Sequence, residues 1–391
     1  MVSISARSRA FSISPTSISA ASIGSAPHQR RQVGAGVVCV LGLAMMLAAC
    51  GSSPSSSTSA TNLPTTPPTL TSKQVTLVTH DSFAVSKSVL AEFTRRTGVT
   101  VKLVQGGDAG QVVNKAILSK GKPQGDVIFG IDNTFLGRAE SAGILAPHQA
   151  KGIDTVDPAL VVPSGLATPI DRGDVCLNVD KEYFSSRDLA APASFDDLLD
   201  PRYRDLTVVE NPASSSPGLA FLLATIDEKG ENGWQSYWQG LKGNGVKVVD
   251  GWESAYYGEF SGGSGKGKRP IVVSYATSPV AEVVYADPRP TSAPTDAVLS
   301  TCFRQIEYAA VLAGAKHPDA AGALIDFMLG TTFQSDIPLQ MFVYPVTSTA
   351  TLPKEFTLFA PVPTDPQTMS AERIEQNRET WLRQWRSVIE G

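Results

Sequence analysis

The alternation of strand-like and helix-like segments in residues 74–143 limits the possible folds of this chain more than any other feature. Segment 74–79 alternates apolar and polar residues, and segments 99–104 and 126–131 also have strand character. The segments between them carry apolar residues at helical spacing, and the first of these ends at Gly98. This β-α-β-α-β order predicts an α/β fold with a mainly parallel sheet flanked by helices.

The first 49 residues have the composition of an export signal. Residues 1–34 are rich in Ser, Ala and Arg without any acidic residue, and an apolar run follows from Val37 to Ala49. The sequence Leu-Ala-Ala-Cys at 47–50 resembles the lipobox of bacterial lipoproteins, in which the cysteine carries the lipid. Residues 52–71 are a Ser/Thr/Pro-rich segment that cannot pack a core, which argues against a buried Cys50. We therefore expect a signal peptide at 1–49, a tether at 50–72, and an exported chain held at the outer face of the cytoplasmic membrane by lipidated Cys50.

Removal of this signal changes the charge and the cysteine content. Four arginines leave with it, so the formal net charge falls from −4 to about −8, which disfavours nucleic acid as a partner. With Cys50 lipidated, the remaining cysteines are Cys176 and Cys302, in an oxidising compartment. Both lie in predicted strands, 174–179 and 302–311, and we predict a disulfide between them; two separate buried thiols are the alternative.

A helix is expected around 195–199, and another at 233–241 holds Trp234, Tyr237 and Trp238 at core spacing.

Polar or aromatic residues follow several predicted strands, including a loop expected at 275–278, and such positions carry ligands in α/β folds. Trp252 and Tyr275 suit a flat, polar, cationic small molecule, although both also fit a core. Asp108 could complement a cation or cap the next helix, and the serines before Gly218 could bind a polar oxygen at a helix start or simply cap it. The pair Asp132-Asn133 is also explained by turn chemistry.

Motifs for catalysis or metal binding are missing from the sequence. It contains no His-Glu-x-x-His, Cys-x-x-Cys or Gly-x-Ser-x-Gly, and no Gly-x-Gly-x-x-Gly follows a strand. The segment 263–268 lacks the spacing of a phosphate loop and precedes a strand, so we expect a surface loop there. Nucleophilic or metal chemistry therefore has few suitable residues, and we expect no enzymatic activity, catalytic residue, metal or cofactor.

A set of motifs in fixed order closely resembles the thiamine-binding subunit of bacterial ABC importers. The similarity extends from about Val75 to the final helix. The motifs are Thr-His-Asp-Ser-Phe at 79–83, Gly-Ile-Asp-Asn at 130–133, Ser-Ser-Pro-Gly-Leu at 215–219, Gly-Trp-Glu-Ser-Ala-Tyr at 251–256, Ser-Tyr-Ala-Thr-Ser-Pro at 274–279 and Tyr-Pro-Val at 344–346.

The resemblance implies a two-lobed periplasmic-binding-protein fold of type II, in which the chain crosses twice between lobes and the ligand lies in the interlobe cleft. Lobe 1 would contain residues 73–172 and 306–391, and lobe 2 residues 173–305. A monomer would capture thiamine or its phosphates and present it to an ABC importer permease. The implied ligand-binding residues are Asp108, Ala109, Ser215, Ser216, Trp252, Tyr275, Ala276, Thr277, Ser278, His80 and Phe342.

The sequence departs from the family pattern at three positions. His80 stands where family members can have Tyr, Ala281 where a second stacking Tyr occurs, and Phe342 where a Trp occurs. The loss at Ala281 leaves three alternatives open: weaker binding, a shifted ligand, or a related substrate such as a pyrimidine precursor or a phosphorylated form.

Two other functions remain as alternatives. Relatives with this fold bind ferric iron through adjacent tyrosines, and Tyr256-Tyr257 is such a pair. An exported hydrolase using one of the Ser-rich loops is the second alternative, although no His/Asp pair has a recognisable spacing for it.

Overall fold

One continuous sheet of ten strands organises the residues that the computed structural model describes, 70–391. The strand order is β2-β1-β3-β9-β5-β8-β6-β7, with β4 paired to β9 and β10 paired to β5. The strands are β1 Gln74–Thr79, β2 Thr100–Gln105, β3 Val127–Asp132, β4 Leu145–Ala146, β5 Thr168–Asp180, β6 Thr207–Glu210, β7 Lys247–Val249, β8 Ile271–Tyr275, β9 Thr295–Leu312 and β10 Tyr344–Pro345.

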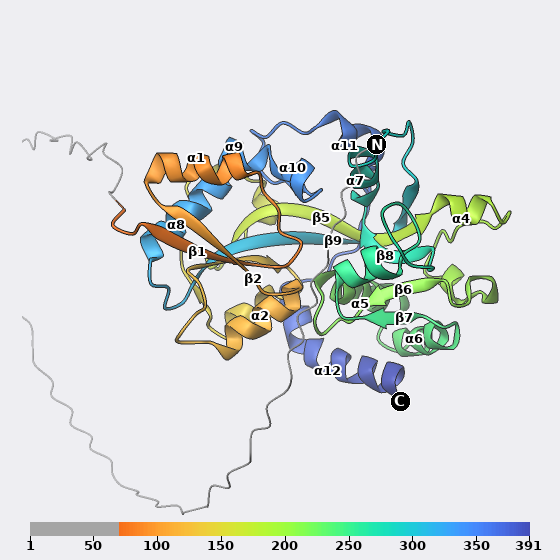
Figure 1. The fold of residues 1–391 in the computed structure, drawn as a ribbon. Helices are drawn as coiled ribbons and strands as arrows, with labels where there is room; N and C mark the ends of the chain where they lie inside the picture. Colours follow the sequence, from red (N-terminus) through yellow and green to blue (C-terminus); the bar gives the residue numbers. More distant parts are fainter. Residues whose placement is uncertain (1–69) are drawn as a thin grey trace, which may run out of the picture. The chain divides into compact units, whose positions relative to one another are not determined.

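Helices flank this sheet, as the sequence predicts for the α/β class (Figure 1). The α-helices are α1 Lys87–Thr97, α2 Ala109–Leu118, α3 Leu136–Ser141, α4 Lys181–Ser185, α5 Ser216–Lys229, α6 Trp234–Gly243, α7 Ser278–Val284, α8 Pro318–Met328, α9 Thr331–Gln334, α10 Ile337–Gln340, α11 Lys354–Phe359 and α12 Ala371–Glu390. Short 3₁₀ helices cover Ile153–Thr155, Pro158–Leu160, Asp196–Leu199 and Pro201–Tyr203, and Ser254–Glu259 is a π-helix. Among the described residues, no helix has the length and apolar character needed to cross a membrane.

The predicted β-α-β-α-β unit is confirmed. β1 pairs in parallel with both β2 and β3, and α1 and α2 connect these strands. α1 ends at Gly98, whose φ of 72° is the left-handed conformation that glycine adopts without a Cβ penalty. The carboxyl ends of β1 and β2 therefore lie side by side, and the polar residues that follow them meet there.

The middle of the sheet differs from the expected parallel arrangement. β6 pairs in parallel with β7 and β8, but β5 and β9 run antiparallel to each other and to their outer neighbours β8 and β3. Figure 1 shows β5 and β9 running together through the middle of the molecule. The expected segments 174–179 and 302–311 are only parts of these strands, because the polar residues at their ends did not indicate that pairing continues. These two long strands join the two halves of the sheet.

Aromatic residues of the last helix complete the larger core. Trp385 of α12 packs edge-on against Trp238 of α6 at 5.6 Å between ring centroids, and Trp381 is equally buried. The expected core role of Trp234, Tyr237 and Trp238 is confirmed, because none of the three is more than 4% exposed. α12 contacts both α3 and α6, and thus residues assigned to each predicted lobe.

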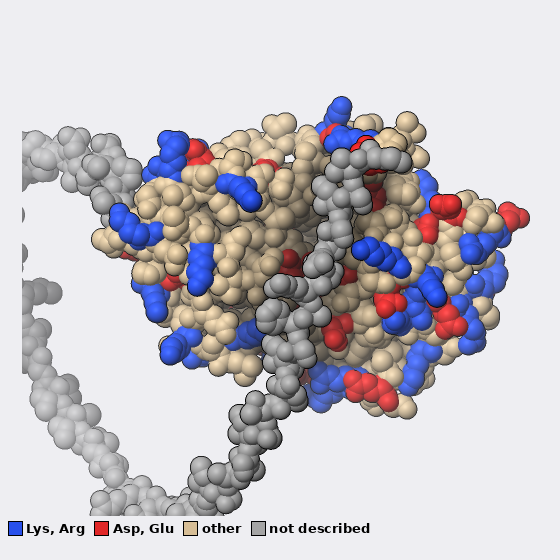
Figure 2. All heavy atoms as spheres, in the orientation of Figure 1, with Lys and Arg blue, Asp and Glu red and all other residues tan. Residues whose placement is uncertain are grey.

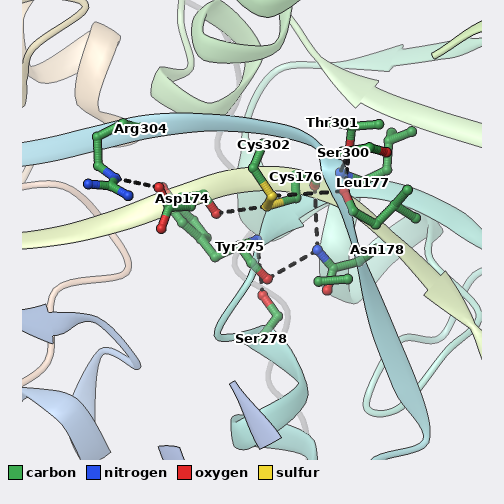
Figure 3. The surroundings of a disulfide bond; sticks show 12 residues. Asp174, Cys176, Leu177, Asn178, Tyr275, Ser278, Ser300, Thr301, Cys302 and Arg304 are labelled. Atoms are coloured by element: carbon green, nitrogen blue, oxygen red, sulfur yellow. Dashed lines mark hydrogen bonds and ion pairs between the residues drawn. A yellow bond between two sulfur atoms is a disulfide. The ribbon is translucent and has the colours of Figure 1, made fainter. Parts of the chain in front are cut away.

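The predicted disulfide between Cys176 and Cys302 is present (Figure 3). Two local expectations need correction. The loop expected at 275–278 leads directly into α7, because Pro279 falls in the first turn of a helix, where its missing N–H is not needed. The helix expected near 195–199 is a single 3₁₀ turn.

Several predictions concern the N-terminal region. The signal peptide, lipidated Cys50 and all of the tether before Leu70 lie outside the described residues. The boundaries of the two lobes remain a prediction.

Candidate functional site

A cavity of about 300 Å³ lies where the loops after β1, β2, β7 and β8 meet the start of α5 and the middle of β9. Figure 2 shows acidic atoms near the middle of this face of the molecule. Nine of the predicted ligand-binding residues line the cavity: His80, Asp108, Ala109, Ser216, Trp252, Tyr275, Thr277, Ser278 and Phe342. Ser215 and Ala276 do not line it, and both side chains are fully buried.

Asp108 joins three loops at the cavity. Its Oδ1 accepts hydrogen bonds from the backbone N–H groups of Ala109 (2.7 Å) and Ser216 (3.1 Å), and its Oδ2 accepts one from Trp252 N–H (3.0 Å). It is therefore the N-cap of α2 and also a bridge to the loops before α5 and after β7. Burial raises the pKa of this carboxyl, and the hydrogen bonds from Trp252 and Ser216 oppose that rise.

The bridge depends on a close backbone approach. Gly110, in the first turn of α2, lies so near the loop before α5 that a Cβ there would be 2.6 Å from the carbonyl oxygen of Ser214. The Gln111 N–H also donates to that oxygen at 3.2 Å. A glycine at this position lets α2 contact the loop directly, which brings Asp108 within reach of the α5 amides.

The three serines before Gly218 all have partners within the chain. Ser214 donates to the Asp250 carbonyl oxygen at 2.7 Å, and Ser215 accepts from the Gly218 N–H at 3.4 Å as the N-cap of α5. The Ser216 hydroxyl contacts Asp132 and accepts from Gln305 at 2.7 Å. The capping interpretation is therefore correct for Ser215, whereas Ser216 forms part of a buried polar network.

Asp132 combines turn chemistry with this network. Its Oδ1 accepts from the backbone N–H groups of Thr134 and Phe135 and from the Thr134 hydroxyl, while Oδ2 faces Ser216. Burial is the main cause that raises the pKa of Asp132 to about 6. Asn133 fixes β9 through hydrogen bonds with the backbone of Arg304 and Ile306.

Trp252 presents a fixed aromatic surface in the cavity. Its ring stacks on Tyr256 at 5.1 Å between centroids with an interplanar angle of 20°, and its indole N–H donates to the Ser274 hydroxyl at 2.9 Å. Tyr257 and Tyr275 pack edge-on against it at 5.4 and 6.4 Å. These contacts fix the plane of the indole before any ligand arrives.

The segment from Tyr275 to Ser278 turns the end of β8 into α7. Ser278 accepts a hydrogen bond from the Tyr275 N–H at 3.2 Å, and Asn178 donates to the Tyr275 carbonyl oxygen at 3.1 Å (Figure 3). Thr277 lines the cavity, and its hydroxyl oxygen is buried with no hydrogen-bond partner among the described residues. Most buried hydroxyls have such a partner, so this one is an exception at the cavity wall.

His80 and Glu307 form a buried pair at the cavity wall. His80 Nε2 lies 3.7 Å from a Glu307 carboxylate oxygen, and both side chains are about one-tenth exposed. Gly130, with a φ of 91°, leaves the space that the His80 ring occupies. Burial alone lowers the pKa of His80, but attraction to Glu307 and the weaker attractions to Asp108 and Asp81 leave that pKa above 6.5.

The comparisons with known proteins agree with this geometry. Residues 122–364 match the sequence family described as bacterial extracellular solute-binding protein. The chain belongs to the family of bacterial extracellular solute-binding proteins.

This solute-binding protein is 28% identical, over 83% of its length and 96% of the relative, to the thiamine-binding periplasmic protein of Escherichia coli strain K12. Its fold is similar to a solved periplasmic thiamin binding protein, with a TM-score of 0.71 and 26% identity over 81% of this chain and 96% of that one. It also shares the fold of iron-bound HitA from Pseudomonas aeruginosa, with a TM-score of 0.63 and 22% identity over 81% and 99%. These likenesses confirm the two-lobed binding-protein fold.

The sequence interpretation missed several residues that line the cavity of the solute-binding protein. They are Asp81, Glu253, Tyr285, Gln305 and Glu307. Glu307 was identifiable in principle, because it is an acid in the otherwise apolar stretch from Ile306 to Leu312. Tyr285 was missed because α7 was not expected. Within the described residues, no group of three or more His, Cys, Asp or Glu side chains is arranged to hold a metal ion.

Tyr285 bears on the unusual Ala281. It lies four residues later, directly after the last residue of α7, and its N–H donates to the Ala281 carbonyl oxygen at 3.0 Å. Both residues line the cavity. Tyr285 packs edge-on against Phe342 at 5.3 Å, and its side chain is largely exposed. Tyr285 thus supplies an aromatic ring to the cavity four residues after Ala281, where the family pattern has a tyrosine.

The His80–Glu307 pair predicts a pH-dependent stability. A histidine whose folded-state pKa lies above its unfolded value contributes stability that is fully present below pH 6.5 and is lost as the pH rises through the folded pKa. We expect His80→Gln to flatten this part of the profile of unfolding free energy against pH, which has a slope of at most about 1.4 kcal/mol per pH unit for one group. Urea unfolding from pH 5.5 to 8.5 measures it.

The control is His317→Gln, which removes a histidine outside the cavity lining. Subtracting the His317→Gln profile from that of His80→Gln isolates the contribution of the pair. Identical profiles for both variants would show that His80 carries no such linkage.

Proposed function

We propose that this protein captures thiamine outside the cytoplasm and delivers it to an ABC importer. The observation that carries the proposal is the cavity itself, which is lined both by Trp252, whose indole is fixed, and by Asp108, whose buried carboxylate accepts from the Trp252 backbone N–H. Thiamine has two aromatic rings, one of them permanently cationic. Aromatic faces and carboxylates attract such a ring, because the face of an aromatic ring is negative.

The roles follow from the contacts. Tyr256 covers one face of Trp252, and the other face is proposed to stack on a ligand ring. Asp108 and Glu307 supply negative charge on the inner wall, and the Thr277 hydroxyl supplies a hydrogen bond. Tyr285 and Phe342, which pack edge-on against each other, add two more aromatic rings to the lining. Ser215 and Ala276 are proposed to act indirectly, by fixing α5 and the loop before α7.

The matching family is extracellular, which supports export of the mature protein. We propose that Cys50 anchors it to the membrane through a lipid, that it acts as a monomer without a cofactor, and that it catalyses no reaction. The permease would recognise the ligand-bound form.

Ferric iron is the less supported cargo. In the tyrosine pair that suggested it, Tyr256 donates its hydroxyl to Glu282 at 2.8 Å and supports Trp252 from behind. Only Tyr257 is half-exposed. The pair therefore has a structural role in positioning the indole.

Calorimetric titration of the purified full-length chain with thiamine tests the proposal. We expect saturable binding at one site. Trp252→Ala is expected to weaken it by about 10- to 100-fold, since stacking and cation–π contacts contribute roughly 1.5–3 kcal/mol together. Tyr183→Ala, which removes an aromatic ring from α4 outside the cavity, is the matched control.

The outcomes separate function from site. No binding of thiamine would contradict the proposed cargo, and a visible absorption band on adding ferric salt would favour iron instead. Thiamine binding that Trp252→Ala leaves unchanged would keep the cargo and contradict the assigned site.

A further inference from the structure

The cavity carries an excess of negative charge. Four carboxylates line it, from Asp81, Asp108, Glu253 and Glu307, and none of the lining residues in the described part of the chain is Lys or Arg. The acids lie at two depths: Asp108 and Glu307 are each 7% exposed, whereas Glu253 is exposed at the rim. A ligand group that points to the bottom of the cavity is therefore near Asp108 and Glu307, and one that points to the cavity entrance is near Glu253.

The donor group best suited to an anion is already used. The start of α5 offers backbone N–H groups that ordinarily favour phosphate. Here the Ser216 N–H donates to Asp108 at 3.1 Å, and the Ser216 hydroxyl is held between Asp132 and Gln305. A phosphate brought to this helix start would have to displace one buried carboxylate and lie beside another.

Cations on neighbouring strands do not offset this charge. Arg304 forms an ion pair with Asp174 away from the cavity lining, and Arg172 lies over the ring of Tyr344 at 4.8 Å. The acids also repel one another: burial chiefly raises the pKa of Glu253, and the charges of Asp81 and Asp108 raise it further. An added anion would increase this repulsion.

From this charge distribution we propose that the site selects the unphosphorylated cation and discriminates against its phosphate esters. The inference rests on the proposed function, because it specifies the form of the same ligand. Free thiamine brings one positive charge to four carboxylates. Each phosphate adds negative charge, and His80, the one lining side chain of the described residues that can become cationic, is already paired with Glu307.

Parallel titrations of the full-length chain with thiamine, thiamine monophosphate and thiamine diphosphate test this inference. We expect the monophosphate to bind at least about tenfold more weakly than thiamine and the diphosphate more weakly still. Raising the salt concentration from 20 to 300 mM should reduce the difference in affinity between thiamine and its phosphates, because screening weakens repulsion between partly exposed charges.

Two variants identify the cause. Glu253→Gln keeps the shape of the side chain while removing one rim charge, and Asp81→Asn does the same on the facing loop. Each should improve the relative affinity for the monophosphate by about three- to tenfold. Glu182→Gln removes one exposed acid from α4, outside the cavity, and controls for net charge.

The results distinguish this inference from the proposed function. Equal or tighter binding of the phosphates, with thiamine also bound, overturns the discrimination and leaves thiamine capture standing. If neither salt nor the two variants change the difference in affinity between thiamine and its phosphates, the inference is also overturned. The phosphates would then be excluded sterically and not by charge. Absence of thiamine binding overturns the proposed function, and the discrimination with it.

Discussion

Replacing Asp108 with alanine is expected to remove most of the affinity for thiamine. The carboxylate accepts three backbone hydrogen bonds, and two of them come from other parts of the chain, from Ser216 at the start of α5 and from Trp252 after β7. Hydrogen bonds to a charged group contribute about 1.5–3 kcal/mol each, so losing these two should weaken binding by a factor on the order of 100 or more. Calorimetry measures the affinity.

A second readout of the same variant concerns the arrangement of the predicted lobes. Without the carboxylate, the N–H groups of Ser216 and Trp252 lose their acceptor across the cavity. Water can satisfy them if the two sides separate, and buried donors left unpaired favour that separation. We therefore expect the radius of gyration of ligand-free Asp108→Ala, from small-angle X-ray scattering, to exceed that of the unchanged protein.

Two further variants distinguish the roles of the Asp108 carboxylate as a charge, as a hydrogen-bond acceptor and as a helix cap. Asp108→Asn keeps one acceptor oxygen and loses the charge, so its affinity should fall between those of the alanine variant and the unchanged protein. Asp157→Ala removes a comparable cap, since Asp157 accepts from the Ala159 N–H at the start of a short 3₁₀ helix outside the cavity. If Asp108→Ala bound thiamine as tightly as Asp157→Ala, the bridging role would be wrong.

Local sequence patterns predicted the features that depend on neighbouring residues. The expected bounds of β1 agree with the structure, and the end of α1 at Gly98 was visible because glycine is favoured in the left-handed conformation. Trp252 and Tyr275 were identified because aromatic residues follow buried strands at the edge where ligands bind. Their positions in the cavity agree with that expectation, while their contact with a ligand stays a prediction.

Features that depend on distant pairing were not predictable in this way. The pairing of β5 with β9 joins residues from 115 positions apart (Asp180 with Thr295) to 141 positions apart (Thr168 with Ala309). No local pattern specifies such a partner. The same applies to Asp108, because the sequence indicated a cap or a cation site but not the amides of Ser216 and Trp252 that reach it from another part of the chain.

The disulfide between Cys176 and Cys302 fixes an irregularity in this long-range pairing. β5 and β9 pair at Val175–Phe303 and again at Leu177–Val298, so residues 299–302 of β9 bulge out opposite a single residue. The Thr301 hydroxyl closes the bulge by accepting from the Leu177 N–H at 3.0 Å. Ala276 packs in the same small cluster as the two cysteines, so the bond lies next to the segment that connects β8 to α7.

Removing this bond should lower stability more than affinity. The two cysteines are 126 residues apart, and a disulfide that closes such a loop contributes about 2–4 kcal/mol, mainly by restricting the unfolded chain. For Cys176→Ala/Cys302→Ala we expect a fall in melting temperature on the order of 5–10 °C. Affinity should change little, because Asn178 and Ser278 still hold the Tyr275 backbone.

Reduction of the unchanged protein provides the matched control. Both cysteines are at most 1% exposed, so thiol reagents should reach the bond only when the chain opens. After unfolding and refolding in dithiothreitol, the protein should melt at about the temperature of the double variant, which itself should not respond to dithiothreitol. Equal melting temperatures for the oxidised protein and the double variant would show that the bond adds no stability. A loss of thiamine binding with stability unchanged would instead show that it acts by positioning the loop at Ala276 and Thr277.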